Sequence, residues 1–596
     1  MPPNRVPRSF FLTALLYLFV PTAVVLIVFG PWPFPAAIVS GLFVYWVMRI
    51  EKPPKISSSS LLSTWPYLIL AAGAVWLSGI LPPFAENSDW HKHYALFNLM
   101  ASHSWPPVVA MDDGIATLRY SLSYYVFPAL AAKCLGILAL PASIFTWTVL
   151  GVYLVLVLAF GRGSSPGIAL IQGCIFLLFS GADIIGTYLS RNVWVLPSPE
   201  FPPFHIEWWS TFGVYASSIT NLFWAPQHAI AGWISVFLVL RYPLQSVQTA
   251  GIIIATLSVW SPFCAVGIFP SLLWATIKTG YRELFTRANL IAAPILLLCA
   301  AMFLSKESAG IPRSFIWDQA HISISVWFAF IVLEFGAIAL ILAIINSQKR
   351  LLIAVHAAFL LVISLFSVGS ANDLLMRASI PSLGLLAALS ATSIVFAKNG
   401  IWKGLLGVCL IAGLATPFGE IARSFVAQRI LHHESFSIQR ILNGESRGYA
   451  PQYLVYEKDI DGRFTIQKVM DLTDLNFSQF GIADFKEEMR IESAGFTDAA
   501  LVSNEVTLPK GLYRLDAVLD WDVTPQKDGK NAGHISFHGK EILIPIMCSK
   551  ACNEHLTRYF ESAGEPFRLC FGLGGWSTGK GFIALKQLEI SSIKAR

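Results

Sequence analysis

Long apolar runs fill the first 420 residues of the chain and constrain its fold more than any other feature. An α-helix rises 1.5 Å per residue, so about 20 apolar residues cross the hydrocarbon core of a bilayer. By this measure the sequence predicts about thirteen membrane-spanning helices. They lie, to within several residues, at 10–29, 33–48, 60–81, 141–160, 167–185, 226–241, 247–260, 263–279, 288–305, 323–346, 351–369, 378–397 and 401–420.

Three of these runs carry further information. The first follows Arg5 and Arg8 as a signal sequence would, but it is longer than a signal peptide's apolar region, so we expect an anchor. Two short runs meet at Trp260-Ser261-Pro262-Phe263, which predicts a pair of broken helices lining a cavity. Glu334 and His356 lie inside predicted spans, where interhelical hydrogen bonds are a better explanation than a proton path.

The composition divides the chain into two parts. With 55% hydrophobic and only 13% charged residues, the 596-residue chain is too apolar for a soluble protein of its size. Residues 1–420 hold 21 Lys and Arg against 14 Asp and Glu, whereas residues 421–596 hold 21 against 22. The second part therefore has the charge density of a water-soluble domain. The basic excess is small and no Lys/Arg tract occurs, so nucleic acid is excluded as a partner.

After about residue 430 the apolar residues form short β-rich runs separated by turn residues, at 512–519, 534–537, 542–547, 567–571 and 582–590. This pattern predicts a β-sandwich over residues 421–596. Cys548, Cys552 and Cys570 lie in this part, where one disulfide and one remaining thiol are compatible with an oxidising compartment. The sequence does not assign the pairing.

The basic residues predict the orientation in the membrane. Lys and Arg in short loops stay in the cytoplasm, and an N-terminus inside places about two cations there for each one outside. The acidic residues show the reverse bias. An odd number of spans then puts residues 421–596 outside, so we expect an integral protein of a bacterial inner membrane with a cytoplasmic N-terminus and an extracytoplasmic C-terminal domain.

The outer segment 82–140 contains the strongest polar cluster, Glu86-Asn87-Ser88-Asp89-Trp90-His91-Lys92-His93-Tyr94. Asn87 or Ser88 can cap a helix that begins at Asp89. At helical spacing Asp89 and His93 share one face, which we expect to look into the protein or a cavity, while an aromatic face of Trp90, Tyr94 and Phe97 can lie on lipid. The alternative is that Asp89 only stabilises the helix N-terminus and the histidines are interfacial. His91 and His93 lack a third ligand at fixed spacing, so no metal site is assigned.

Several of these residues resemble a known family. The series Asp89, Tyr94, Ser104-Trp105-Pro106, Tyr124-Tyr125 and Lys133-Cys134-Leu135-Gly136 is similar to the first external loop of GT-C-fold glycosyltransferases, polytopic enzymes that use polyprenyl-phosphate sugars. The resemblance covers roughly residues 60–400. It implies that Asp89 is catalytic, that Ser258–Trp274 forms the family's short paired helices, and that the turn with Asp373 and Arg377 holds the lipid phosphate.

The chain also departs from the family pattern. Where members often carry a second acidic residue near a proline, it reads Trp224-Ala225-Pro226-Gln227-His228, which argues against a metal-dependent mechanism. No cofactor is assigned, and the sequence leaves open whether a divalent metal ion binds. Two spans precede the first outer loop, so residues 1–59 would be a two-helix extension of the GT-C-like domain 1–420.

Cations and polar residues in the outer segments complete the predicted site. Arg377 binds phosphate through a fork of donors, although pairing with Asp373 or with lipid head groups is the alternative. Arg119 with Tyr120, and Lys92, are second candidates for the donor phosphate. Glu86, Tyr94, Gln227, His228 and Asp373 would line the cavity, with Gln227 and His228 at a helix mouth.

The leading hypothesis is an inverting glycosyltransferase on the extracytoplasmic face of the membrane. Asp89, oriented by His93 or Lys92, would act as general base on a hydroxyl of a glycan, lipid or protein acceptor. Two other hypotheses remain. A flippase for lipid-linked glycans predicts charges near the bilayer midplane and related halves, and a membrane-anchored carbohydrate-binding protein predicts far fewer spans.

Overall fold

The computed structural model describes residues 8–595 except 51–63, 112–113, 162–164, 193–204, 305–311, 319–321, 370, 434–435, 439–440, 442–452, 457–463, 476, 481–483, 487–489, 494–499, 525–532, 539–541, 547–551 and 574–579. The chain forms two compact units. The first comprises residues 1–106 and 119–441 and is helical, and the second comprises 107–118 and 442–596 and is rich in strands. The predicted boundary at residue 420 lies within a helix of the first unit, and part of the predicted outer loop 82–140 belongs to the second.

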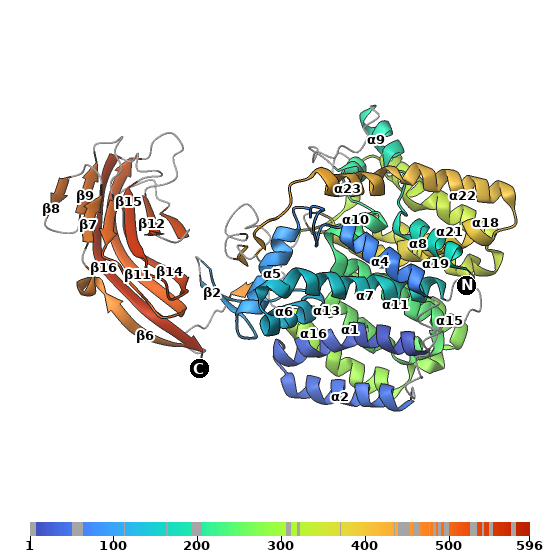
Figure 1. Ribbon diagram of the computed structural model, residues 1–596, viewed down its shortest axis with the longest axis horizontal. Helices are drawn as coiled ribbons and strands as arrows, with labels where there is room; N and C mark the ends of the chain where they lie inside the picture. The colour runs from blue at the N-terminus through green and yellow to red at the C-terminus, as the bar shows by residue number, and fades with distance from the viewer. Residues whose placement is uncertain are drawn as a thin grey trace. The chain divides into compact units, whose positions relative to one another are not determined.

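The first unit is built mainly from helices (Figure 1). They are α1 (Arg8–Val28), α2 (Pro33–Ile50), α4 (Trp65–Leu77), α5 (Trp90–Ser102), α6 (Ser123–Leu135), α7 (Leu140–Phe160), α8 (Pro166–Leu177), α9 (Asp183–Arg191), α10 (Ser218–Trp224), α11 (Pro226–Arg241), α12 (Pro243–Gln248), α13 (Ala250–Trp260), α14 (Pro262–Gly267), α15 (Phe269–Thr279), α16 (Ala293–Leu304), α17 (Ile324–Ile331), α18 (Ala337–Ile345), α19 (Arg350–Ile363), α20 (Asp373–Ala378), α21 (Ile380–Phe396), α22 (Gly400–Gly413) and α23 (Ala415–Val426). Within this unit, α1 and α2 lie on one side of α7, and α22 and α23 lie on the opposite side (Figure 1).

Several helices have the length and apolarity of membrane spans. Among the described residues, five stretches qualify: Phe10–Val28, Ile137–Phe160, Pro262–Thr279, Ile324–Ile345 and Gly400–Val426. Six shorter apolar helices accompany them. The prediction of a helical membrane protein is thereby supported, while the number of thirteen spans stays a prediction.

The core of the helical unit lies around α11 and α21, whose side chains are nearly all buried. Two glycines allow these helices to approach closely. A Cβ on Gly232 would lie 2.6 Å from Ile380 of α21, and a Cβ on Gly384 would lie 2.6 Å from Trp233 of α11. Small residues at such a contact permit the dispersion packing that holds helices together where lipid removes the hydrophobic drive.

The predicted helix break is present, and so are the interhelical hydrogen bonds predicted for His356. Helix α13 ends at Trp260 and α14 begins at Pro262, with the Ser261 hydroxyl accepting the Cys264 N–H at its start. His356 of α19 contacts Ser382 of α21 through Nδ1 at 2.8 Å and Ser271 of α15 through Nε2 at 3.2 Å. His356 therefore joins three helices.

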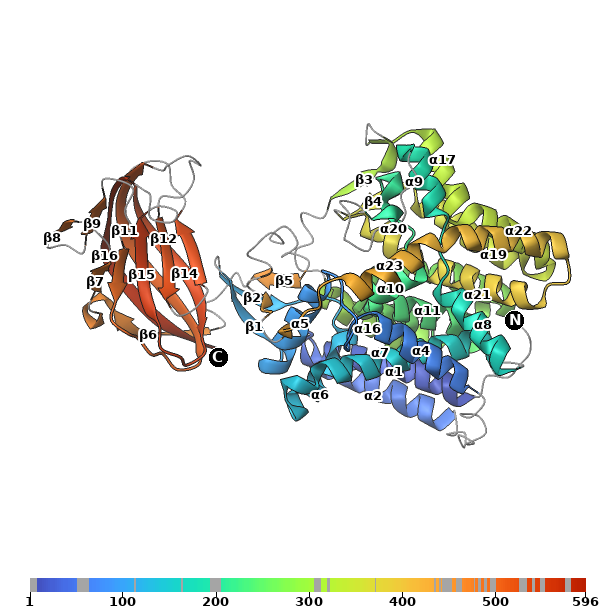
Figure 2. The same cartoon turned by 45° about the horizontal axis from the view of Figure 1, so that its top comes forward.

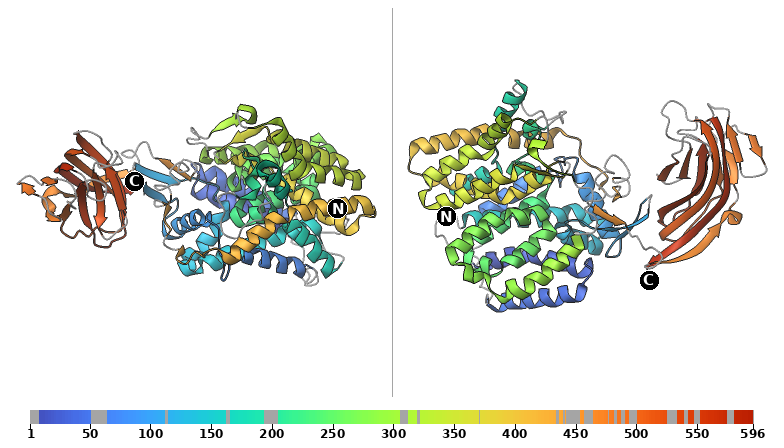
Figure 3. Two further views of the ribbon diagram at one scale, coloured as in Figure 1. Left: turned by 90° about the horizontal axis from the view of Figure 1, so that it is seen from above. Right: turned by 180° about the vertical axis from the view of Figure 1, so that it is seen from behind.

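The second unit contains two larger sheets. Strands β13 (Ile542–Ile546), β12 (Gly533–His538), β15 (Arg568–Leu573), β10 (Ala500–Ser503) and β7 (Phe477–Phe480) form one, and β14 (Cys552–Ser562), β11 (Gly511–Thr524), β16 (Lys580–Ala595), β9 (Arg490–Ser493) and β8 (Asp484–Lys486) form the other, with β6 (Phe464–Asp471) paired to β16. Antiparallel β11 and β16 run side by side for most of their length (Figure 2). Figure 3 shows the same strands from two further sides.

Residues of both sheets share one apolar core. Leu501 and Phe571 of the first sheet belong to the same buried cluster as Leu515, Trp521 and Ile590 of the second. The prediction of a strand-rich C-terminal region is confirmed. A further three-stranded sheet joins β1 (Val108–Met111), β2 (Gly114–Leu118) and β5 (Leu454–Tyr456).

The cysteines of this unit are described in part. Cys570 is a free, buried thiol in β15. Cys548 and the side chain of Cys552 lie outside the described residues, so the predicted disulfide stays a prediction.

Candidate functional site

The polar cluster after α4 starts helix α5. Asp89 occupies the position before the first helical residue, and its N–H donates to Asn87 Oδ1 over 3.0 Å. The helix thus begins where the sequence predicts. The expectation for its aromatic face is wrong, because Trp90, Tyr94 and Phe97 are at most 1% exposed. These rings pack inside the protein instead of on lipid, since they have polar and aromatic partners there.

Side chains at the start of α5 bind the last carbonyls of α10. Asn87 Nδ2 and Trp90 Nε1 both donate to Phe223 O, at 2.8 and 2.9 Å. His93 Nε2 lies 3.0 Å from Trp224 O. The final carbonyls of a helix have no partner within the helix, so these three side chains satisfy groups that would otherwise be buried without hydrogen bonds. The α10–α11 turn is thereby fixed against α5.

The two contacts of His93 define its tautomer. A carbonyl oxygen only accepts, so Nε2 carries the proton, and Nδ1 accepts from the Tyr125 hydroxyl 2.6 Å away. Burial lowers the pKa of His93 to about 4, with the charges of Lys92 and Arg377 acting in the same direction. His93 is therefore neutral at pH 7 and has both ring nitrogens engaged.

Asp89 pairs with Lys92 and not with His93. Lys92 Nζ lies 2.8 Å from Asp89 Oδ1, and the two side chains are 30% and 32% exposed. An ion pair this accessible adds little to stability. Of the two residues expected to orient Asp89, Lys92 is the one that contacts its carboxylate in the structure.

Arg377 lies at the end of the short helix α20. Its Nε lies 3.1 Å from Asp373 Oδ1, one helical turn earlier, with the side chains 22% and 19% exposed. Asn372 fixes the start of this helix: its Oδ1 accepts the Leu375 N–H, and its Nδ2 donates to Phe212 O at 3.0 Å. Asn372 adopts a left-handed conformation with φ of 50°, which Asn tolerates better than most residues.

The structure brings the predicted acid and the predicted phosphate ligand to the same histidine. The charges of Asp89, Lys92 and Arg377 all act on His93. Cys264 Sγ links the backbone here, since it contacts His228 O at 3.5 Å and Arg377 O at 3.2 Å.

His228 and Gln227 lie in the first turn of α11, which Pro226 starts. Both are buried, at 3% and 2% exposed. In the described part of the chain, neither ring nitrogen of His228 nor Gln227 Oε1 has a hydrogen-bond partner. Buried polar atoms are nearly always hydrogen-bonded, so these three atoms are suited to a polar ligand.

The remaining predicted residues divide between this cluster and other places. Tyr120 contributes a ring 6.2 Å from that of Tyr125, the partner of His93. Arg119 lies over the ring of Phe303 in α16, 5.9 Å from its centroid.

Glu86 is buried and bound to the end of the helical unit. Its Oε1 accepts the Tyr94 hydroxyl at 2.8 Å, and its Oε2 accepts the Ile430 N–H at 3.4 Å. Burial raises the pKa of Glu86, and the hydrogen bond from Tyr94 opposes this effect. Glu86 and Tyr94 therefore connect α5 to the segment after α23.

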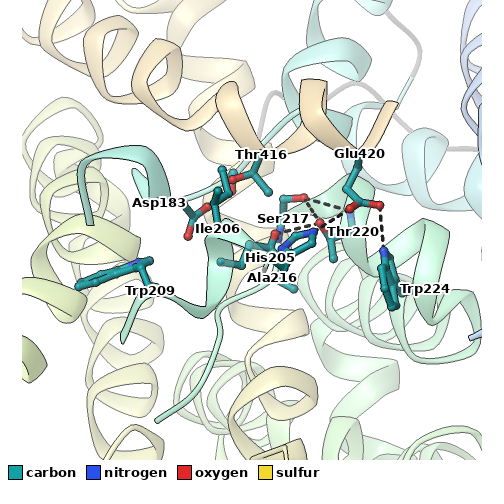
Figure 4. A network of polar contacts seen from close by, with 12 residues as sticks. Asp183, His205, Ile206, Trp209, Ala216, Ser217, Thr220, Trp224, Thr416 and Glu420 are labelled. Atoms are coloured by element: carbon teal, nitrogen blue, oxygen red, sulfur yellow. Dashed lines mark hydrogen bonds and ion pairs between the residues drawn. The ribbon is translucent and has the colours of Figure 1, made fainter. Parts of the chain in front are cut away.

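A second polar network adjoins this cluster, and the sequence did not identify it (Figure 4). Its centre is Glu420 of α23, whose Oε1 lies 2.7 Å from His205 Nε2 and whose Oε2 accepts from Trp224 Nε1 at 2.8 Å and Arg423 Nε at 3.2 Å. Trp224 is also the residue whose carbonyl binds His93. We call His205, Glu207, Trp224, Glu420 and Arg423 the Glu420 network.

His205 bridges two carboxylates in this network, because its Nδ1 lies 3.6 Å from Glu207 Oε2. Burial lowers the pKa of His205, but Glu207 and Glu420 outweigh it and raise the pKa to about 9. Burial raises the pKa of Glu207 to about 7, with His205 opposing. His205 is therefore an imidazolium at neutral pH, which donates a hydrogen bond to Glu420 and lies within ion-pair distance of Glu207.

These shifts predict how stability depends on pH. Both pKa values are higher in the folded state, so the folded chain binds more protons than the unfolded chain. The stabilisation is complete at low pH, and it is lost between about pH 4.5 and 7 for Glu207 and between about pH 6.5 and 9 for His205. The midpoint of thermal unfolding in detergent should fall from pH 6.5 to 9. His205→Gln should make the unfolding midpoint less dependent on pH, whereas the exposed control His555→Gln should leave that dependence unchanged. An equal pH dependence in both variants would contradict the assignment.

Neither the structure nor the comparisons with known proteins assign a metal site or a family. Within the described residues, no group of three or more His, Cys, Asp and Glu side chains is arranged to hold a metal ion. In comparisons with protein-family models, with curated proteins and with solved structures, the chain matches none.

Proposed function

We propose that this chain is a membrane glycosyltransferase that transfers a sugar from a polyprenyl phosphate to a hydroxyl acceptor with inversion. In this proposal the helical unit is a GT-C-like domain of about thirteen spans in a bacterial inner membrane. Its site opens to the extracytoplasmic face, where the strand-rich unit also lies.

One observation carries the proposal. A half-exposed carboxylate, Asp89, and a guanidinium, Arg377, come from distant parts of the sequence, and both act on one buried neutral imidazole, His93. Glycosyl transfer needs these two kinds of group around one reacting carbon: a base for the acceptor and a cation for the departing phosphate.

The chemistry then follows from the two groups. The acceptor O–H gives its proton to Asp89 as its oxygen forms the bond to the anomeric carbon. The bond from that carbon to the phosphate oxygen breaks, and the phosphate leaves with the electron pair. The guanidinium N–H groups of Arg377 donate to the phosphate and stabilise the negative charge that develops on it. His228 and Gln227, with buried polar atoms that have no partner in the described residues, would bind hydroxyls of the sugar.

The alternatives fit less well. A flippase would place its ionisable residues along a path between related halves. The Glu420 network is buried, and hydrogen bonds and ion pairs link Glu420 to His205, Trp224 and Arg423, which suits a fixed scaffold better than a moving one. A membrane-anchored carbohydrate-binding protein would not need the polar site in the helical unit.

The test of the phosphate site uses farnesyl phosphate as a short probe. The purified full chain in detergent at fixed salt should bind farnesyl phosphate and not farnesol. Arg377→Ala should weaken binding roughly ten- to a hundredfold, the range for charged hydrogen bonds, and Arg377→Lys should weaken it less because the charge remains. The matched control is Arg313→Ala, an exposed arginine of β3 (Arg313–Phe315), which should bind as the parent does.

Pairing with Asp373 is the competing role of Arg377. If Arg377 only neutralises Asp373, the double variant Asp373→Ala with Arg377→Ala should recover the binding that each single variant loses, since no charge is then left without a partner. Recovery would contradict phosphate binding. Continued loss in the double variant, with the fold verified by circular dichroism, would support it.

A further inference from the structure

A separate cavity lies at one end of helices α18, α21 and α22. Its volume is about 450 Å³, and its lining includes Asn346, Ser393, Phe396, Lys398, Asn399 and Trp402. Asn346, one of the polar lining residues, is held by two hydrogen bonds: its Nδ2 donates to Ser393 Oγ at 3.0 Å and to Leu342 O at 3.1 Å. None of these residues belongs to the candidate transferase site. The cavity is therefore distinct from that site, and its lining combines polar and apolar residues.

The first residues of α22 also line the cavity. Asn399 precedes this helix of 14 residues, and its Oδ1 accepts the Trp402 N–H at 3.3 Å. The other first-turn N–H groups have no partner inside the helix, and the helix dipole makes this end positive. An anion in the cavity would be stabilised here.

Lys398 lines the cavity, and the charged residues next in sequence to the lining segments are also basic. Lys349 and Arg350 follow α18, and Lys398 and Lys403 flank the start of α22. In the sequence, Asp373 is the only acidic residue between Glu334 and Glu420, and it lies at the other end of α21, beside Arg377. Arg350 Nε is held by Ala343 O at 3.1 Å. The cavity is thus complementary to an anion, and no carboxylate of these segments competes for it.

An apolar surface continues from the cavity along α22. Phe396, Ile401, Leu405 and Val408 are all exposed side chains, between 44% and 76%. They belong to helices with the composition of membrane spans. The basic residues at this end assign it to the cytoplasmic face, where anionic lipids are concentrated.

We propose that this cavity binds an anionic phospholipid, with the phosphate headgroup at Lys398 and the α22 N-terminus and the acyl chains along the exposed face of α22. The combination of a basic polar cavity with an adjoining apolar face distinguishes a lipid from a soluble phosphate. The site is independent of the proposed transferase activity.

Native mass spectrometry of the detergent-purified full chain tests this proposal. The probes are dioleoylphosphatidylglycerol, dioleoylphosphatidylcholine and glycerol 1-phosphate. Dioleoylphosphatidylglycerol should bind more tightly than dioleoylphosphatidylcholine. Lys398→Gln should weaken phosphatidylglycerol binding about fivefold, the effect of one basic residue near an anionic membrane surface, and Lys398→Glu should weaken it further. Lys398 is exposed, so these variants should fold.

The matched control is Lys278→Gln, which removes a lysine at the end of α15, beside Trp274 and outside the cavity. It should bind phosphatidylglycerol as the parent does. Equal binding by Lys398→Gln, Lys278→Gln and the parent would overturn the proposal. Binding of glycerol 1-phosphate as tight as that of the lipid would also overturn it, because a soluble phosphate would then suffice.

Discussion

Asp89→Asn should abolish sugar transfer and leave the protein folded. The amide has the shape of the carboxylate, and Asp89 is a half-exposed residue whose pairing with Lys92 adds little to stability. The amide does not accept the acceptor's proton, so the reaction loses its general base. This loss typically lowers the rate by about two to four orders of magnitude.

The assay needs a polyprenyl-phosphate sugar as donor, because farnesyl phosphate carries no sugar, and the binding of that donor is measured first. Asp318→Asn is the matched control, because Asp318 is another exposed carboxylate, which accepts the Phe315 N–H. It should turn over as the parent does. Parental turnover by Asp89→Asn, with donor binding unchanged, would remove Asp89 from the mechanism and return it to the role of a helix-starting residue.

Local signals explain what could be predicted from the sequence. The start of α5 follows from polar residues before an apolar periodic stretch, and the break between α13 and α14 follows from Ser261 and Pro262. The pair of Asp373 and Arg377 follows from four-residue spacing on one helix. Each of these features depends on residues within one or two turns of each other.

Long-range contacts explain what could not be predicted. Glu420 meets His205 and Trp224, both about 200 positions away in the sequence, and no spacing rule connects them. A partial signal was present, since Glu420 and Arg423 lie three apart near the end of an apolar run and so share a helix face. The burial of α5 was missed for a similar reason. An aromatic helix face suits lipid and protein equally, and only its contacts in the folded chain show which of the two it meets.

The membrane spans show the same limit. A length criterion of about 20 residues selects apolar runs, but it does not show whether a run is one helix or several. The run at 263–279 is divided between α14 and α15, and the apolar segment 401–420 joins α22 to α23. The count of spans is therefore less secure than the apolar character of the unit.

Replacing Glu420 is expected to have the largest effect on stability. Glu420 is 3% exposed and accepts from three segments, through His205, Trp224 and Arg423. Glu420→Leu would leave the imidazolium of His205 and the guanidinium of Arg423 buried without this carboxylate. Breaking a buried ion pair from one side typically costs about 3–5 kcal/mol. The midpoint of thermal unfolding in detergent should fall by several degrees, and farnesyl phosphate binding should weaken as well, because Trp224 also holds His93.

A double-mutant cycle separates the network from a general packing loss. Glu283→Leu is the matched control, since Glu283 accepts a hydrogen bond from the uncharged amide of Gln248 at 2.7 Å and leaves no buried cation when it is replaced, so the midpoint should change little. Combining Glu420→Leu with His205→Leu should cost less than the sum of the single changes, because the second removes a cation that the first leaves unpaired. Additive losses would show that Glu420 and His205 act independently. A cost below the sum would establish that the Glu420 carboxylate and His205 are energetically coupled, as their 2.7 Å contact predicts.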